Sequence, residues 1–129
     1  MNMAFEKISS GSKFERQYGH SRAVVANNTI YVAGTVGFDY ENDTIVDDAG
    51  EQTRQTFRNI EKALEEAGAS LSDLVQIVTY FTNHEDWDAI GEVLGETLRD
   101  IRPCNAGVRV DLIDPRMKVE ISAVAVKTT

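Results

Sequence analysis

Two stretches with the helical spacing of apolar residues, 49–67 and 85–101, stand in a chain whose other apolar segments have the short or alternating patterns of strands. In the first stretch, Phe57, Ile60 and Leu64 recur three or four positions apart, so they form one apolar stripe. Each helix is expected to lay such a stripe against a sheet. Because two helices can cover only one face of a sheet of about six strands, the other face is left for a further partner.

Local signals define the ends of these helices. Asp48 and Glu51 resemble a capping pair before the first helix, and Gly68 supplies a left-handed stop after it. In the second helix, Gly91 and Gly95 fall on one side, which we interpret as a close approach of helix to sheet rather than a ligand contact.

The remaining segments predict strands. "SRAVVANNTIYVAG" is typical of a hairpin that turns at two asparagines, whereas residues 38–50 are acidic and turn-rich, as in a solvated loop. "DLVQIVTYFT" is apolar on both faces, which predicts a central strand covered on both sides. "NAGVRVDL" and "KVEISAVAV" are expected to close the chain as two paired strands. We therefore predict a single α+β domain over residues 1–129.

One face of the last strand is uniformly apolar, whereas the opposite face carries Lys118, Glu120 and Ser122 before Val124 and Val126. On the preceding strand Asn105, Gly107 and Arg109 share a face, so polar groups of the two strands are expected to meet. A partly apolar sheet face that no helix covers favours association with further copies of the chain.

Composition excludes several classes of partner. The formal net charge of −8 argues against nucleic acid and against anionic membranes, since both are bound through clustered basic side chains. The single cysteine, Cys104, cannot form an internal disulfide and is interpreted as a buried structural residue. With no spanning segment apparent, we expect a cytoplasmic protein that is complete as written. His20 and His84 lie in no metal-binding pattern, so no metal is expected, and "GTVG" lacks nucleotide-binding spacing.

What remains is a set of polar residues on predicted strands, and any of them alone is more typical of ordinary surface or interface chemistry. Among these residues, a buried carboxylate can act as general acid or base, or can bind an ammonium group. The set comprises His20, Arg22, Thr35, Asn105, Arg109 and Glu120.

Four segments together resemble the Rid family, also called the YjgF-like or endoribonuclease L-PSP family. They are "GHSRAV", "IYVAGTVG", "QTRQTFRNIEKALEEAGASLSDLVQIVTYF" and "RPCNAGVRVDLIDPRMKVEISAVAV". The resemblance implies a chorismate-mutase-like fold with two helices on a mixed six-stranded sheet. It also implies a homotrimer with a central barrel and clefts between subunits. In the deaminase branch these clefts hasten the hydrolysis of reactive enamines and imines to 2-oxo acids and ammonia, with no cofactor.

The chain departs from the deaminase branch at several of these positions. Asn105 in "PCN" stands where that branch has the arginine of "PAR", which holds the substrate carboxylate, and an amide carries no charge to replace it. His20 replaces the tyrosine of "PYSQAV", and Ala33 replaces a serine before the glycine, whereas Glu120 matches. Arg22 or Arg109 is a candidate for supplying the absent charge.

These residues predict a site with Glu120 as the catalytic group and His20, Ala33, Thr35, Asn105 and Gly107 as substrate-binding positions. One hypothesis is a hydrolase or deaminase for an imine-type or related small metabolite other than 2-aminoacrylate. The alternative is a trimer that binds a small ligand, or acts like a chaperone, without turnover. Retention of Glu120 favours the first and loss of the arginine favours the second, whereas the acidic charge argues against a ribonuclease.

Overall fold

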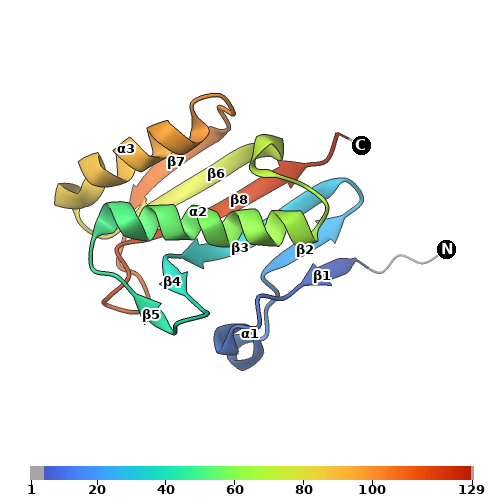
Figure 1. Ribbon diagram of the computed structural model, residues 1–129, viewed down its shortest axis with the longest axis horizontal. Coiled ribbons are helices and arrows are strands. Elements are labelled where there is room, and N and C mark those ends of the chain that lie inside the picture. Colours follow the sequence, from blue (N-terminus) through green and yellow to red (C-terminus); the bar gives the residue numbers. More distant parts are fainter. Residues whose placement is uncertain (1–4, 129) are drawn as a thin grey trace.

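The last strand of the chain lies inside the main sheet, between two strands that precede it in sequence (Figure 1). The structure is a computed structural model that describes residues 5–128. The six strands follow the order β1-β2-β3-β8-β6-β7. Only β6 and β7 run parallel, so the sheet is mixed. The strands are β1 (Glu6–Ile8), β2 (Ala23–Ala26), β3 (Thr29–Val36), β6 (Leu74–Phe81), β7 (Cys104–Arg109) and β8 (Val119–Val126).

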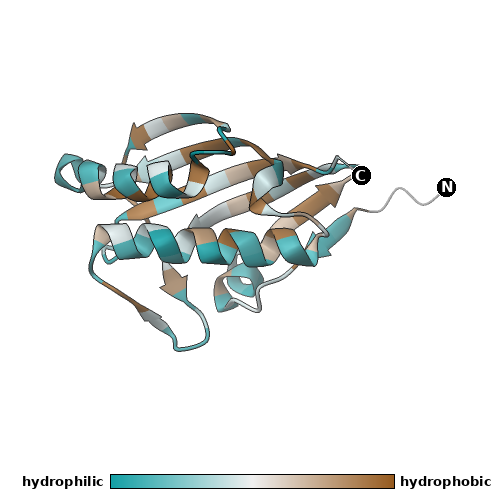
Figure 2. Cartoon of the chain, turned by 45° about the horizontal axis from the view of Figure 1, so that its top comes forward, coloured by the Kyte–Doolittle hydropathy of each residue, from teal (hydrophilic) through white to brown (hydrophobic). Residues whose placement is uncertain are grey.

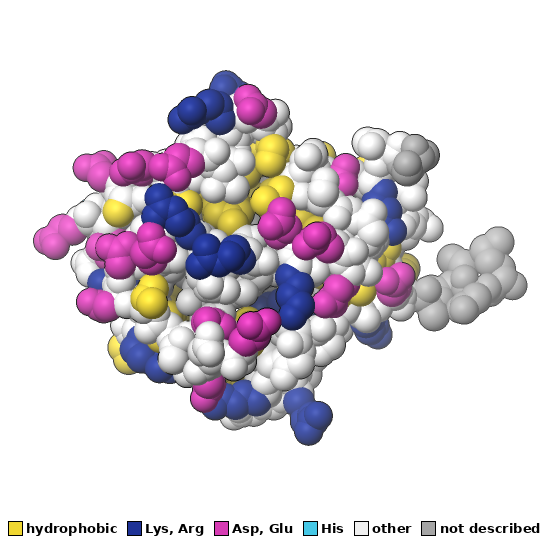
Figure 3. Space-filling view, viewed as in Figure 1, with side chains coloured by type: hydrophobic (Ala, Val, Ile, Leu, Met, Phe, Trp, Pro, Cys, Tyr) yellow, Lys and Arg dark blue, Asp and Glu magenta, His cyan; other side chains and the backbone are white. Residues whose placement is uncertain are grey.

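Two long helices, α2 (Ala49–Glu66) and α3 (Trp87–Leu98), cover the same face of this sheet (Figure 1). Arg54 on α2 and Glu96 on α3 form an ion pair at 3.2 Å. Apolar segments concentrate along the strands, whereas the helices are largely hydrophilic on their outer side (Figure 2). Basic and acidic side chains lie interspersed over this helix-covered side of the molecule (Figure 3). The predicted arrangement of two helices on one face of a mixed six-stranded sheet is therefore confirmed.

Several local predictions also agree with the structure. The Asp48 carboxylate accepts a hydrogen bond from the Glu51 backbone N–H at 2.8 Å, which caps the first turn of α2. Gly68 has φ +81°, the left-handed conformation that ends the helix. Asn27 has φ 56° in the turn between β2 and β3. Within 38–50, however, the chain forms a small two-stranded sheet of β4 (Phe38–Asp39) and β5 (Thr44–Ile45), which the prediction of a solvated loop did not include.

Short helical segments complete the chain, and local spacing did not predict them. They are α1 (Lys13–Tyr18), η1 (Leu71–Asp73) and η2 (His84–Asp86). The Ser12 hydroxyl accepts from the Phe14 backbone N–H at 3.2 Å at the start of α1, and Gly19 ends that helix with φ +73°. Six residues are too few to display an amphipathic period, so α1 has no stripe to detect.

The predicted pairing of the last two strands is wrong. β6 lies between β7 and β8, because the connection through α3 returns the chain parallel to β6 on its outer side. β6 is therefore an interior strand next to the edge strand rather than the centre of the sheet. Its second face is not covered by this chain, since Val78 and Tyr80 are half-exposed there.

The sheet therefore has one buried and one open face. Ile121 and Ala123 of β8 are buried beneath the helices. On the open face Tyr31 is 52% exposed and Val108 39% exposed. The expected close approach at Gly91 and Gly95 is absent, because a Cβ at either position would have nothing within 4 Å. In the described residues, no helix is both long and apolar enough to cross a membrane.

Candidate functional site

A cavity of about 280 Å³ lies where β3 ends and β8 begins, and its wall is mostly apolar. The segment around α1 forms one side, and the loop between β7 and β8 forms another. Glu120 is the carboxylate that the main sheet contributes to the wall of this cavity. The lining residues are Ser12, Phe14, Tyr18, His20, Arg22, Gly34, Val36, Tyr40, Ile113, Asp114, Pro115, Met117 and Glu120.

The Glu120 side chain lies against the backbone of Gly34. A Cβ at Gly34 would lie only 2.9 Å from Cδ of Glu120 and closer still to Oε2, so a larger residue cannot occupy this position without moving the carboxylate. Gly34 lies in an irregular part of β3, where the register against β8 shifts between Val32 and Thr35. The bulge therefore places a backbone position without a side chain directly against the carboxylate.

Burial raises the pKa of Glu120 above its usual range, and the positive charge of Arg22 opposes this change. A carboxyl group in such a place can hold a proton closer to neutral pH than an exposed glutamate. It is therefore suited to exchange protons with a bound molecule.

Two other carboxylates near the pocket are already engaged. Burial alone would raise the pKa of Glu15, but hydrogen bonds from Ser10 and Ser9 outweigh this effect and lower it. These bonds hold α1 beside the pocket. The Arg116 side chain donates to Asp114 at 2.8 Å and lowers the pKa of that carboxyl to about 2, so the charge of Arg116 is paired at the rim.

The predicted residues of the first half of the chain separate into two groups. His20 is exposed and lines the Glu120 cavity directly after α1. Ala33 is half-buried, and its carbonyl accepts a hydrogen bond from the Thr35 hydroxyl at 2.8 Å. Thr35 itself is fully buried and pairs with Ile121 on the helix-covered face. The structure thus brings His20 to Glu120 and places Thr35 on the opposite face.

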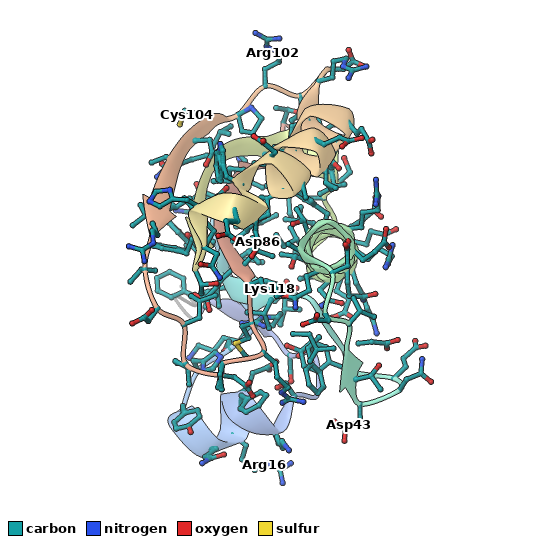
Figure 4. All side chains as sticks on the ribbon, turned by 90° about the vertical axis from the view of Figure 1, so that its left-hand side faces the viewer. Arg16, Asp43, Asp86, Arg102, Cys104 and Lys118 are labelled. Atoms are coloured by element: carbon teal, nitrogen blue, oxygen red, sulfur yellow. The ribbon has the colours of Figure 1, made fainter. Side chains whose placement is uncertain are left out.

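The predicted residues on β7 lie at the edge of the sheet, away from this cavity. The Asn105 amide oxygen accepts a hydrogen bond from the Thr79 hydroxyl at 3.1 Å. A Cβ at Gly107 would lie 3.0 Å from the Trp87 ring, so this glycine lets the indole pack over β7. Cys104 is exposed, not buried as expected, and lies at the outer edge of the same strand (Figure 4).

Asn105 and Glu120 of one chain cannot contact the same small molecule. Asn105 is aligned with Ile77, and Glu120 with Tyr80 three residues further along β6. Two strand spacings of about 4.8 Å and three residues of about 3.3 Å each place their backbones about 14 Å apart. Their side chains also lie on opposite faces of the sheet, because Ile77 is buried beneath the helices and Tyr80 is on the open face. A site that contains both residues therefore requires two copies of the chain.

The sequence model described as Endoribonuclease L-PSP matches residues 11–127, nearly the whole chain. The chain belongs to this family. A RutC family protein from Pyrococcus abyssi is 36% identical over 84% of this chain and 86% of its own length. A protein from Acinetobacter baylyi named 3-aminoacrylate deaminase RutC is 36% identical over 80% of this chain and 82% of its own.

Solved structures agree with this assignment. A YjgF-family protein from Mycobacterium tuberculosis has a TM-score of 0.87 and 41% identity, and the match covers 96% of the present chain and 100% of the M. tuberculosis chain. A YjgF-family protein from Neisseria meningitidis has a TM-score of 0.84 and 25% identity, with coverage of 100% and 99%. The fold is therefore that of the YjgF, or Rid, proteins.

Sequence patterns missed part of the cavity. Tyr18, Ile113 and Met117 line it but lie in segments with no chemical motif. Gly34 was visible as part of "GTVG", and the structure places it in the irregular part of β3. Its contact with Glu120 depends on the pairing of β3 with β8, which the sequence does not display. Across residues 5–128, no group of three histidine, cysteine or acidic side chains is arranged to hold a metal ion.

Proposed function

We propose that this family member forms a cytoplasmic homotrimer, with the open sheet faces packed together as a central barrel and small-molecule clefts between subunits. In each cleft, Glu120 of one subunit faces Asn105 of a neighbour. The substrate is a reactive imine or enamine, or a related metabolite, other than 2-aminoacrylate. Hydrolysis releases a carbonyl compound and ammonia without a cofactor.

The observation that carries this proposal is the Glu120 carboxyl itself, with its raised pKa, set against Gly34 in a mostly apolar cavity. As general base, its carboxylate accepts a proton from the water that adds to the carbon of a C=N bond. As general acid, the resulting carboxylic acid returns that proton to the nitrogen, which gives a tetrahedral intermediate that bears a hydroxyl and an amino group. The hydroxyl proton is transferred to the nitrogen as the C–N bond breaks and the C=O bond forms. Water supplies the oxygen of the product and ammonia leaves, so no oxidant or reductant is needed.

The position of Asn105 supports a site shared between subunits, since about 14 Å of sheet separates it from Glu120 within one chain. The exposed Tyr31 and Val108 on the open sheet face support an apolar interface there. The names of relatives support the reaction class: one is a 3-aminoacrylate deaminase, and a Dermatophagoides farinae protein with 29% identity is named 2-iminobutanoate/2-iminopropanoate deaminase.

Binding without turnover is the second candidate, and the neutral amide of Asn105 favours it. An amide offers hydrogen bonds to a carboxylate but no ion pair, so a substrate oriented by charge at this position is held less firmly. The two candidates differ in one measurable property, the release of product.

The test is hydrolysis of enamines and imines generated in situ, with 2-iminobutanoate formed by a dehydratase and with 3-aminoacrylate also included in the panel. Glu120→Gln is compared with wild type and with Glu92→Gln, the same change at an exposed position of α3. Loss of a general acid or base is expected to lower kcat by about 10²-fold or more in Glu120→Gln alone. Equal rates in Glu120→Gln and wild type would contradict the catalytic role, and ligand binding with no turnover in wild type would establish the second candidate.

A further inference from the structure

Arg22, directly before β2, is a buried arginine with unused hydrogen-bonding capacity. Arg22 is only 5% exposed. One terminal nitrogen, Nη2, donates to the Gly34 carbonyl at 2.9 Å. Nε is buried, and it is the one such side-chain nitrogen or oxygen in residues 5–128 that has no hydrogen-bond partner. A guanidinium withdrawn from water with an unpaired donor is costly unless another group pairs with it.

The acidic side chains whose pKa values respond to Arg22 do not form an ion pair with it. Glu15 and Glu120 both sense its charge, but the ion pairs found among the described residues do not include Arg22. The Glu15 carboxylate is instead hydrogen-bonded to Ser9 and Ser10. Arg22 thus keeps positive charge available beside Glu120.

Position in the cavity separates Arg22 from the other candidate cation. Arg22 is the one arginine or lysine that lines the Glu120 cavity, which also contains His20 and Gly34. Arg109 is exposed at the far end of β7, beyond β6, and does not line it. Asn105 brings only a neutral amide.

We propose that Arg22 binds the anionic group of the molecule that occupies the Glu120 cavity. This inference rests on the proposed function only for the location of the site. A carboxylate oxygen accepts a charge-assisted hydrogen bond from the guanidinium, while Glu120 faces the reacting end of the molecule. Because Nη2 is engaged by Gly34, Arg22 holds the carboxylate with fewer donors than a fully available arginine would offer.

The experiment measures binding of pyruvate and of pyruvamide, its neutral amide of similar shape, to the full-length protein by calorimetry. Wild type is expected to bind pyruvate at least about tenfold more tightly than pyruvamide, as one charge-assisted hydrogen bond allows. Arg22→Gln is expected to remove this preference, because glutamine keeps a polar amide at this position but carries no charge. Arg22→Lys retains the charge and is expected to retain part of the preference, which provides a second variant if Arg22→Gln does not fold.

Arg58→Gln and Arg109→Gln are the matched controls. Arg58 lines a second cavity of about 300 Å³ beside α2, which Arg22 also lines. Arg58→Gln therefore tests whether pyruvate binds in that second cavity instead of the Glu120 cavity. Both controls are expected to keep the preference for pyruvate. A purely structural role of Arg22 would weaken pyruvate and pyruvamide alike and leave their ratio unchanged.

Three results would overturn the inference: no pyruvate binding or no charge preference in wild type, a preference that persists in Arg22→Gln, or a preference lost in either control. A different observation would contradict the proposed reaction: release of product by Glu120→Gln as fast as by wild type. Charge preference in binding and dependence of turnover on Glu120 can therefore fail separately.

Discussion

Replacing Gly34 with alanine tests how closely the site depends on the position of the Glu120 carboxylate. The new Cβ would lie 2.9 Å from Cδ, whereas ordinary contacts begin at 3.4 Å, so the carboxyl carbon must move by about 0.5 Å or more. A flexible glutamate can make this movement through a side-chain rotation, at a cost to stability of about 1 kcal/mol. Catalysis is more sensitive, because a displacement of about 1 Å can lower a rate by about 10²-fold.

We therefore expect Gly34→Ala to lower kcat/KM by about 10- to 100-fold while the protein remains folded. The assay is the initial rate of carbonyl product release on the best substrate of the panel, together with urea unfolding of the same preparations. Gly95→Ala is the matched control, because a Cβ at Gly95 in α3 has nothing within 4 Å. It is expected to leave the rate unchanged and to stabilise the helix by up to about 1 kcal/mol.

A wild-type rate in Gly34→Ala would refute the reasoning, because it would mean that the carboxylate tolerates displacement. Equal losses of rate in Gly34→Ala and Gly95→Ala would refute it as well, since the effect would not depend on proximity to Glu120. A large fall in the urea midpoint of Gly34→Ala would instead show that the backbone, and not the glutamate side chain, had to move.

Three further predictions follow from the same structure. Burial raises the pKa of Glu120 in the folded state, so ionisation of this carboxyl disfavours the folded state as pH rises through that pKa. Glu120→Gln is therefore expected to raise the urea midpoint at pH 7. The gain is expected to vanish below about pH 4, where the carboxyl is protonated in both the folded and the unfolded state. A gain that persists at pH 3 would exclude this cause. The loss of the arginine at position 105 is expected to lower the rate on 2-aminoacrylate by about one to two orders of magnitude, in line with the roughly 1.5–3 kcal/mol of a charge-assisted bond, and Asn105→Arg is expected to restore part of it. A wild-type rate equal to that of an arginine-bearing homologue would contradict this view of Asn105 and would mean that Arg22, Arg109 or a neighbouring subunit fully replaces the missing charge. Tyr31→Asp places a charge on the open sheet face and is expected to reduce the proposed trimer to monomers in light scattering, whereas the same change at exposed Val46 beside β5 is expected to leave the mass unchanged.

The sequence alone determined the elements whose signals are local. The apolar stripe, the Asp48 cap and Gly68 together define α2, because capping and left-handed stops act within a few residues of the chain. Alternation along 119–126 correctly separated the buried Ile121 and Ala123 from the face of Glu120, because successive side chains of a strand point to opposite faces.

Tertiary structure decided which of these residues meet. Nothing in the order of the chain indicates that β6 lies between β7 and β8, so Asn105 and Glu120 were expected on neighbouring strands and lie about 14 Å apart. The bulge in β3 turns Thr35 into the core and leaves Gly34 beneath Glu120. Arg22 was one of two candidate cations in the sequence, and the pairing of β2, β3 and β8 places it in the cavity of Glu120. Periodicity reports only the face on which a side chain lies, whereas contacts between strands depend on pairing and register, which are set by distant parts of the chain.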